Sequence, residues 1–209
     1  MSLKTQNIPV IIVYVIFNFS IFFIIYKNGY FDIDSLQNIF QEFSKKDGVF
    51  FILLPIILII FQGILPAKIK EILVFWKIKN RLPGCQAFSK YLKEDNRIDK
   101  RKLMEKYGKL PKKEEKQNKF WYKIYKEVSS DTSIAKTHKD YLLTRELTIL
   151  TIFFIFIFPI ILFYNDINIK TLILFMIFLI LEYLIIRYAS KNYAVRLVTN
   201  VMALASAKS

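Results

Sequence analysis

The sequence has very few of the residues that form covalent cross-links or metal centres. It contains one cysteine, Cys85, and one histidine, His138, among 209 residues. A single cysteine excludes an internal disulfide and a cysteine-rich zinc site. A single histidine weakens the case for a metal site, because zinc takes three or four protein ligands. We therefore expect no metal and no other cofactor, and we interpret Cys85 as a small apolar residue.

Catalytic signatures are missing as well. The chain has only five glycines, and it contains neither a glycine-rich phosphate loop nor an aromatic RNA-binding motif. His138 and Asp140 invite an acid–base interpretation, but no second histidine and no positioned nucleophile accompany them. We therefore do not expect an enzyme, and a membrane enzyme acting on lipid-linked substrates is the least favoured function.

Hydrophobic and charged residues are both abundant, and they occupy different parts of the chain. The sequence is 54% hydrophobic, yet its net charge is +14. Four apolar runs are long enough to cross about 30 Å of hydrocarbon, and each must be helical because lipid offers no partners to backbone groups. These runs are Ile8–Tyr26, Val49–Leu65, Leu147–Tyr164 and Leu172–Tyr188. We predict an all-α membrane protein with four transmembrane helices.

The charges between these runs predict the orientation of the chain. Residues 67–146 contain 22 basic and 11 acidic side chains, and residues 189–209 contain three basic side chains and no acidic one. Residues 27–47 contain three basic and four acidic side chains, and residues 165–170 contain one of each. Positively charged segments stay in the cytosol. We therefore expect a bacterial inner-membrane protein with residues 67–146 and both termini in the cytosol.

This pattern divides the chain into four parts. Residues 1–66 hold transmembrane helices 1 and 2 with a short external loop. Residues 67–146 form a basic helical cytosolic domain inserted between spans 2 and 3. Residues 147–188 hold transmembrane helices 3 and 4, and residues 189–209 form a cytosolic tail that could be an oligomerisation helix.

Residues 111–128, PKKEEKQNKFWYKIYKEV, are the most informative segment of the basic domain. At 100° per residue, five lysines share an arc of about 80°, and aromatic and aliphatic side chains occupy the opposite arc. This lysine ridge consists of Lys112, Lys116, Lys119, Lys123 and Lys126. Because like charges on one face repel, we predict that the ridge binds an anionic nucleotide or oligonucleotide. Anionic lipid headgroups and a merely solvated face are the alternatives.

We expect the chain to form a homo-oligomer, most simply a tetramer. Two further features of the sequence bear on this assembly. Glu182 is the only ionisable residue well inside a predicted span, and in an oligomer it would repeat as a ring that favours cations in a pore. Alternatively, Glu182 pairs with Arg187 or Arg145, or reaches the cytosolic interface. The tail has apolar residues at the a–d spacing of a coiled-coil seam, with packing on its own domain as the alternative. The seam consists of Ala194, Leu197, Val201 and Leu204.

The order of two spans, a cytosolic insert and two further spans resembles the small membrane effectors of bacterial anti-phage systems. The resemblance is architectural and covers the whole chain, and the insert from 81 to 145, with RLPGCQAFSK, QNKFWYKIY and HKDYLLTRE, is distinctive. The chain most resembles the channel-forming effector of the Hailong system, and next the four-span effectors of cyclic-oligonucleotide defence. The resemblance implies an oligomeric pore controlled by a nucleotide polymer, with a nucleotidyltransferase encoded nearby, that depolarises the membrane and arrests growth.

Two functions of different classes follow from these observations. The first is an oligomeric ion channel in anti-phage defence, gated by an anionic nucleotide or oligonucleotide on the basic domain. The second is a non-conducting, membrane-anchored scaffold that recruits a partner, a nucleic acid or anionic lipid through the same basic domain.

Overall fold

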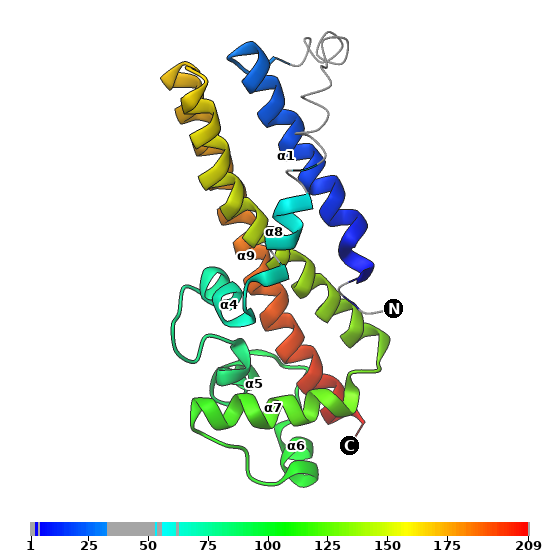
Figure 1. The fold of residues 1–209 in the computed structure, drawn as a ribbon. Coiled ribbons are helices and arrows are strands. Elements are labelled where there is room, and N and C mark those ends of the chain that lie inside the picture. Colours follow the sequence, from blue (N-terminus) through cyan, green and yellow to red (C-terminus); the bar gives the residue numbers. More distant parts are fainter. Residues whose placement is uncertain (1–2, 4, 33–52, 54–55, 62, 209) are drawn as a thin grey trace. The chain divides into compact units, whose positions relative to one another are not determined.

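The computed structural model describes residues 3, 5–32, 53, 56–61 and 63–208 (Figure 1). These residues form helices joined by turns, with no strand among them. Within them, the α-helices with defined ends are α1 (Ile8–Asn28), α4 (Ala67–Phe75), α5 (Leu92–Glu94), α6 (Lys100–Tyr107), α7 (Glu114–Val128), α8 (Thr132–Tyr164) and α9 (Ile169–Ala207). Shorter helical turns are η1 (Thr5–Asn7), η2 (Pro83–Gln86) and η3 (Ala87–Tyr91). The prediction of an all-α protein is confirmed at this level.

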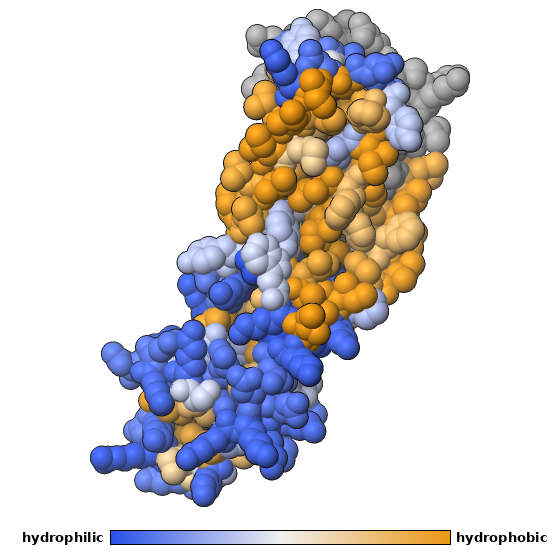
Figure 2. All heavy atoms as spheres, turned by 90° about the vertical axis from the view of Figure 1, so that its left-hand side faces the viewer, coloured by the Kyte–Doolittle hydropathy of each residue, from blue (hydrophilic) through white to orange (hydrophobic). Residues whose placement is uncertain are grey.

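The chain divides into two compact units. Unit 1 consists of Met1–Gln6, Ala67–Arg145 and Arg187–Ser209, and unit 2 consists of Asn7–Pro66 and Glu146–Ile186. The long helices α8 and α9 each contribute residues to both units. Figure 2 shows mainly hydrophilic side chains on the visible face of unit 1 and mainly hydrophobic ones on that of unit 2.

Three helices are long and apolar enough to cross a membrane. They cover Thr5–Asn28, Thr132–Tyr164 and Ile169–Ala207, and they include the first, third and fourth predicted spans. These helices indicate a multi-pass membrane protein. The second predicted span, Val49–Leu65, lies partly outside the described residues.

An aromatic cluster joins α1 to α8 in unit 2. The Phe22 and Phe158 rings stack with centroids 4.4 Å apart, and Phe154 stacks on Phe158 at 4.8 Å. All three side chains are fully buried. Large apolar side chains on α8 and α9 remain exposed in unit 2, among them Phe163, Leu174 and Ile185. An exposed apolar surface of this kind is stable in lipid and not in water.

The core of unit 1 forms where α6, α7 and the C-terminal part of α9 pack together. Leu103, Ile124 and Val201 are fully buried in one apolar cluster. Helix α6 begins where the Asp99 carboxylate accepts the backbone N–H groups of the first helical turn. Gln117 joins α7 to η3, because its buried Oε1 accepts the backbone N–H groups of both residues 88 and 89.

The loop before α6 contains an ion pair, and its arginine also bonds to α9. The Asp95 carboxylate lies 2.6 Å from Arg97 Nη2, which also donates to Asn200 Oδ1 at 3.0 Å. The hydrogen bond from Arg97 is the main reason that the pKa of Asp95 falls to about 2. A carboxyl group whose pKa is lower in the folded state stabilises the fold above its unfolded pKa of about 4. That stabilisation is lost as the pH falls through the folded value.

We therefore expect Asp95→Asn to remove one acid-dependent step in the stability of unit 1. The step lies between about pH 4 and pH 2, and it is worth about 1 kcal/mol or less because the Arg97 side chain is 60% exposed. The thermal midpoint of the full chain, measured against pH in detergent, should fall less steeply in this window for Asp95→Asn than for the wild type. Parallel curves would contradict this account of the ion pair.

Candidate functional site

The lysine ridge lies on and immediately before α7, and all five of its lysines are exposed. The helix begins at Glu114, after Lys113 in extended conformation. The helical spacing predicted for the ridge included Lys112, and this part of the prediction is wrong because Lys112 precedes the helix. The physical reason is the Gln117 side chain, whose Nε2 donates to the Lys112 carbonyl oxygen at 2.8 Å. Four ridge lysines thus follow the helical spacing, and Lys112 lies at its entrance.

The opposite face of α7 is packed into the core of unit 1. Ile124 and Val128 are buried, and Phe120, Trp121 and Tyr125 pack against the same cluster while remaining partly exposed. This packing fixes the rotation of α7 about its axis. Because the apolar side chains of α7 are fixed in the core of unit 1, the lysines of the ridge face away from that core.

Two of the three acidic side chains of α7 have partners outside the ridge. Glu127 Oε2 accepts the Tyr107 hydroxyl at 2.7 Å, and Glu114 Oε2 accepts Asn80 Nδ2 at 2.8 Å. Burial, reinforced by Glu127, raises the pKa of Tyr107, so its hydroxyl keeps its proton and donates. In the described part of the chain, the lysines of the ridge form no ion pair. Their charge is available to an external anion.

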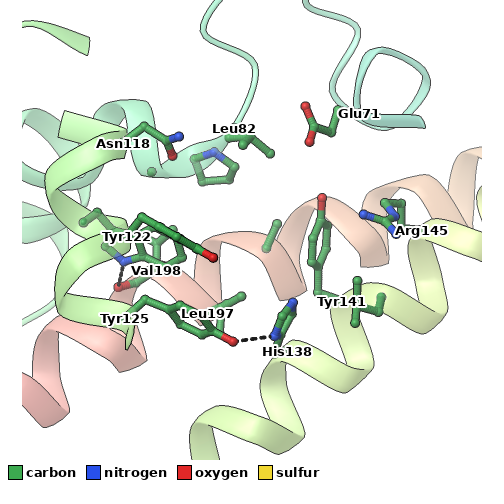
Figure 3. A pocket seen from close by; sticks show the side chains of 15 residues that line it. Glu71, Leu82, Asn118, Tyr122, Tyr125, His138, Tyr141, Arg145, Leu197 and Val198 are labelled. Carbon is green, nitrogen blue, oxygen red and sulfur yellow. Dashed lines mark hydrogen bonds between the residues drawn. The ribbon is translucent and has the colours of Figure 1, made fainter. Parts of the chain in front are cut away.

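Beside α7, a pocket of about 190 Å³ opens within unit 1 (Figure 3). Segments far apart in the sequence build it: α4, η2, α7, α8 and the C-terminal part of α9. Its walls combine aromatic rings with a few polar groups. The lining residues are Glu71, Leu82, Pro83, Gly84, Asn118, Trp121, Tyr122, Tyr125, His138, Tyr141, Leu142, Arg145, Ala194, Leu197 and Val198.

Hydrogen bonds and ring contacts hold the pocket walls in place. The Tyr125 hydroxyl lies 2.8 Å from His138 Nδ1 (Figure 3), and the two rings meet edge to face. Burial raises the pKa of Tyr125, so the hydroxyl keeps its proton at neutral pH and can donate to the imidazole. The Arg145 guanidinium lies 5.8 Å from the centre of the Tyr141 ring. Tyr125 therefore holds the imidazole of His138 in place.

The proposed tail seam lies inside unit 1. Ala194, Leu197 and Val201 are buried in the core cluster, and Leu204 packs against it. Trp121 Nε1 donates to the backbone oxygen of residue 198 at 3.3 Å. Packing within one chain thus explains the apolar pattern of the tail, and a coiled coil between subunits would have to remove these side chains from the core.

Glu182 has a partner within unit 2. Asn18 Nδ2 on α1 donates to Glu182 Oε1 at 3.2 Å, and Tyr14 and Thr151 hydroxyls lie 2.6 Å apart nearby on α1 and α8. Asn18 is fully buried, whereas Glu182 is half-buried. Glu182 therefore contributes to contact between helices of one chain. Its place in a pore stays a prediction.

The sequence indicated the ridge and the apolar face of α7 but not the pocket. The signal that marks the pocket is three-dimensional, since its walls come from five segments. Cys85 is buried in η2, and burial raises the pKa of its thiol. Comparison with family models, curated proteins and solved structures gave no match, so the functional argument rests on the side chains described here.

Proposed function

We propose that this chain is a membrane effector whose basic unit 1 binds an anionic nucleotide or oligonucleotide in the cytosol. Binding controls an ion channel formed by several copies of the apolar unit 2 and depolarises the membrane. The observation that carries this proposal is the exposed lysine ridge on a helix whose other face is buried. A solvated helix does not need its lysines aligned, whereas a phosphate chain does.

The finer features of this proposal come from the sequence. They are four transmembrane helices, the basic domain inserted after the second, an inner-membrane location and cytosolic termini. The resemblance to Hailong-type effectors supports a role in anti-phage defence, with a nucleotidyltransferase as the source of the ligand. A subunit of this size leaves little room for a pore within a single chain, so conduction requires a closed homo-oligomer. We favour a tetramer.

The alternative function is a non-conducting scaffold anchored in the membrane. Two observations favour it, because both features that pointed to an oligomeric pore have partners within one chain. The tail residues pack in the core of unit 1, and Glu182 accepts a hydrogen bond from Asn18. Ligand binding by the ridge is common to both functions, so conduction separates them.

Ion flux into liposomes distinguishes the two functions. The purified full chain is reconstituted into potassium-loaded liposomes, and the membrane potential is followed with a dye, with and without a single-stranded oligonucleotide. We expect the oligonucleotide to change the flux, and we expect Glu182→Gln to alter the cation preference if the carboxylates line the pore. Flux that is absent under every condition, with the oligonucleotide bound, would rule out the channel and favour the scaffold.

A further inference from the structure

The pocket beside α7 has a size, a lining and a position that match one part of a nucleotide. We propose that it holds the base of a nucleotide whose phosphates lie on the lysine ridge. This inference rests on the proposed function, since it assigns a second part of the ligand to the same unit. It adds a specific element to a site that would otherwise recognise negative charge alone.

The volume of the pocket limits what can enter it. Pockets for drug-sized ligands are about 300–1,000 Å³, whereas this pocket measures about 190 Å³. It is therefore too small for a whole nucleotide and suits a single ring system. The phosphates of such a ligand must remain outside the pocket, where the exposed lysines can reach them.

The lining of the pocket matches a planar aromatic ring. Trp121 and Tyr125 are nearly parallel at 25°, with centroids 5.7 Å apart, and Tyr122 is tilted from Tyr125 by 22° at the same distance. Aromatic side chains bind bases by stacking, which every base allows because each has a π-face. Tyr122 is 49% exposed, so a base can reach this ring without unfolding the core.

The pocket lining includes the side-chain amide of Asn118. Asn118 Oδ1 is buried and accepts no hydrogen bond. Gly84 leaves the space for this amide, because a Cβ at Gly84 would collide with Asn118 Oδ1. A buried acceptor without a donor costs free energy. Turning the Asn118 amide from Gly84 toward the pocket would let its oxygen accept an N–H group of a base.

A direct contact connects the ridge to the pocket. Lys126 Nζ lies 5.2 Å from the centre of the Tyr122 ring. Tyr122 lines the pocket, and Lys126 is a member of the ridge. A ligand bound at Tyr122 would therefore lie close to a ridge ammonium group, which its phosphates could meet.

The test uses Trp121 as a reporter in the full chain. The chain has two tryptophans, so Trp76→Phe leaves Trp121 alone, in the pocket wall. The protein is placed in nanodiscs and titrated with ATP, or with tripolyphosphate, which has a similar charge and no base. Each probe is also used to displace a labelled single-stranded oligonucleotide. Tyr122→Ala removes the exposed ring, and Tyr122→Phe is the matched control.

We expect ATP to quench Trp121 and to bind about tenfold more tightly than tripolyphosphate, because one base stacks. Tyr122→Ala should lower the affinity for ATP about tenfold and leave the affinity for tripolyphosphate unchanged. Tyr122→Phe should leave both affinities unchanged. Equal affinities for the two probes, or an ATP affinity that Tyr122→Ala does not change, would contradict the proposal that the pocket holds a base. Neither result would affect the proposal for the ridge. Quenching of Trp121 fluorescence by a brominated phospholipid and not by ATP would mean that the pocket binds lipid, and it would also contradict the proposal that the pocket holds a base. If the oligonucleotide does not bind at all, the proposed function fails with it.

Discussion

Replacing Lys119 and Lys123 with glutamate should lower the affinity of the full chain for a single-stranded oligonucleotide by about a hundredfold or more. Both side chains are exposed on α7, and the double substitution turns two attractive contacts into two repulsive ones. The wild-type affinity should fall steeply with salt, because each neutralised phosphate of a single strand contributes a log–log slope of about −0.7. Fluorescence anisotropy in nanodiscs of neutral lipid, at several salt concentrations, measures both quantities.

The matched control is the same charge change on another helix of unit 1. Lys100 and Lys102 are exposed on α6, so replacing both with glutamate changes the net charge equally. We expect this variant to bind the oligonucleotide with only a small loss. An equal loss in both variants would mean that net charge, and not the ridge, attracts the ligand. An unchanged affinity of the ridge variant would make the ridge a solvated face or a contact for anionic lipid.

Leu197→Ala should destabilise unit 1 by about 3 kcal/mol, as expected for a buried leucine shortened to alanine. Leu197 is 5% exposed and lies in the core cluster and in the pocket wall. The thermal midpoint, followed by Trp121 fluorescence in the Trp76→Phe background, should fall clearly. Leu184→Ala is the matched control on the same helix, and its effect should be much smaller because Leu184 is 39% exposed.

The dependence on protein concentration separates the two interpretations of the tail. Packing within one chain predicts that the loss caused by Leu197→Ala is the same at every protein concentration. A coiled coil between subunits predicts a loss that varies with concentration, because association follows mass action. A concentration-dependent loss, together with dissociation of an oligomer, would contradict the packing described for the tail.

The apolar helices could be predicted from the sequence, and so could the two faces of α7. A long run of apolar residues has one stable structure in lipid, which is a helix. The 100° spacing placed Ile124 and Val128 opposite the lysines, and they are buried in the structure. Local periodicity is sufficient for both inferences. It was not sufficient at Lys112, where a side-chain hydrogen bond from Gln117 holds the chain outside the helix.

The sequence left the partner of the tail open and did not indicate the pocket, because both depend on contacts between distant parts of the chain. The a–d spacing of the tail is the same whether its partner is another subunit or its own core. Trp121 and residue 198 are 77 positions apart where they form a hydrogen bond. No local pattern encodes such a pairing, nor does it identify Asn18 as the partner of Glu182.

The central claim is that the basic unit lies in the cytosol while the short segment between α8 and α9 lies outside. Single cysteines at Asn96 and at Asp166, both exposed, test this claim in a Cys85→Ala background. A membrane-impermeant maleimide is applied to bacteria that express each variant, before and after permeabilisation. We expect Asp166→Cys to be labelled in intact cells and Asn96→Cys only after permeabilisation. Labelling of Asn96→Cys from outside intact cells would contradict the account, because a cytosolic nucleotide could not then reach the ridge.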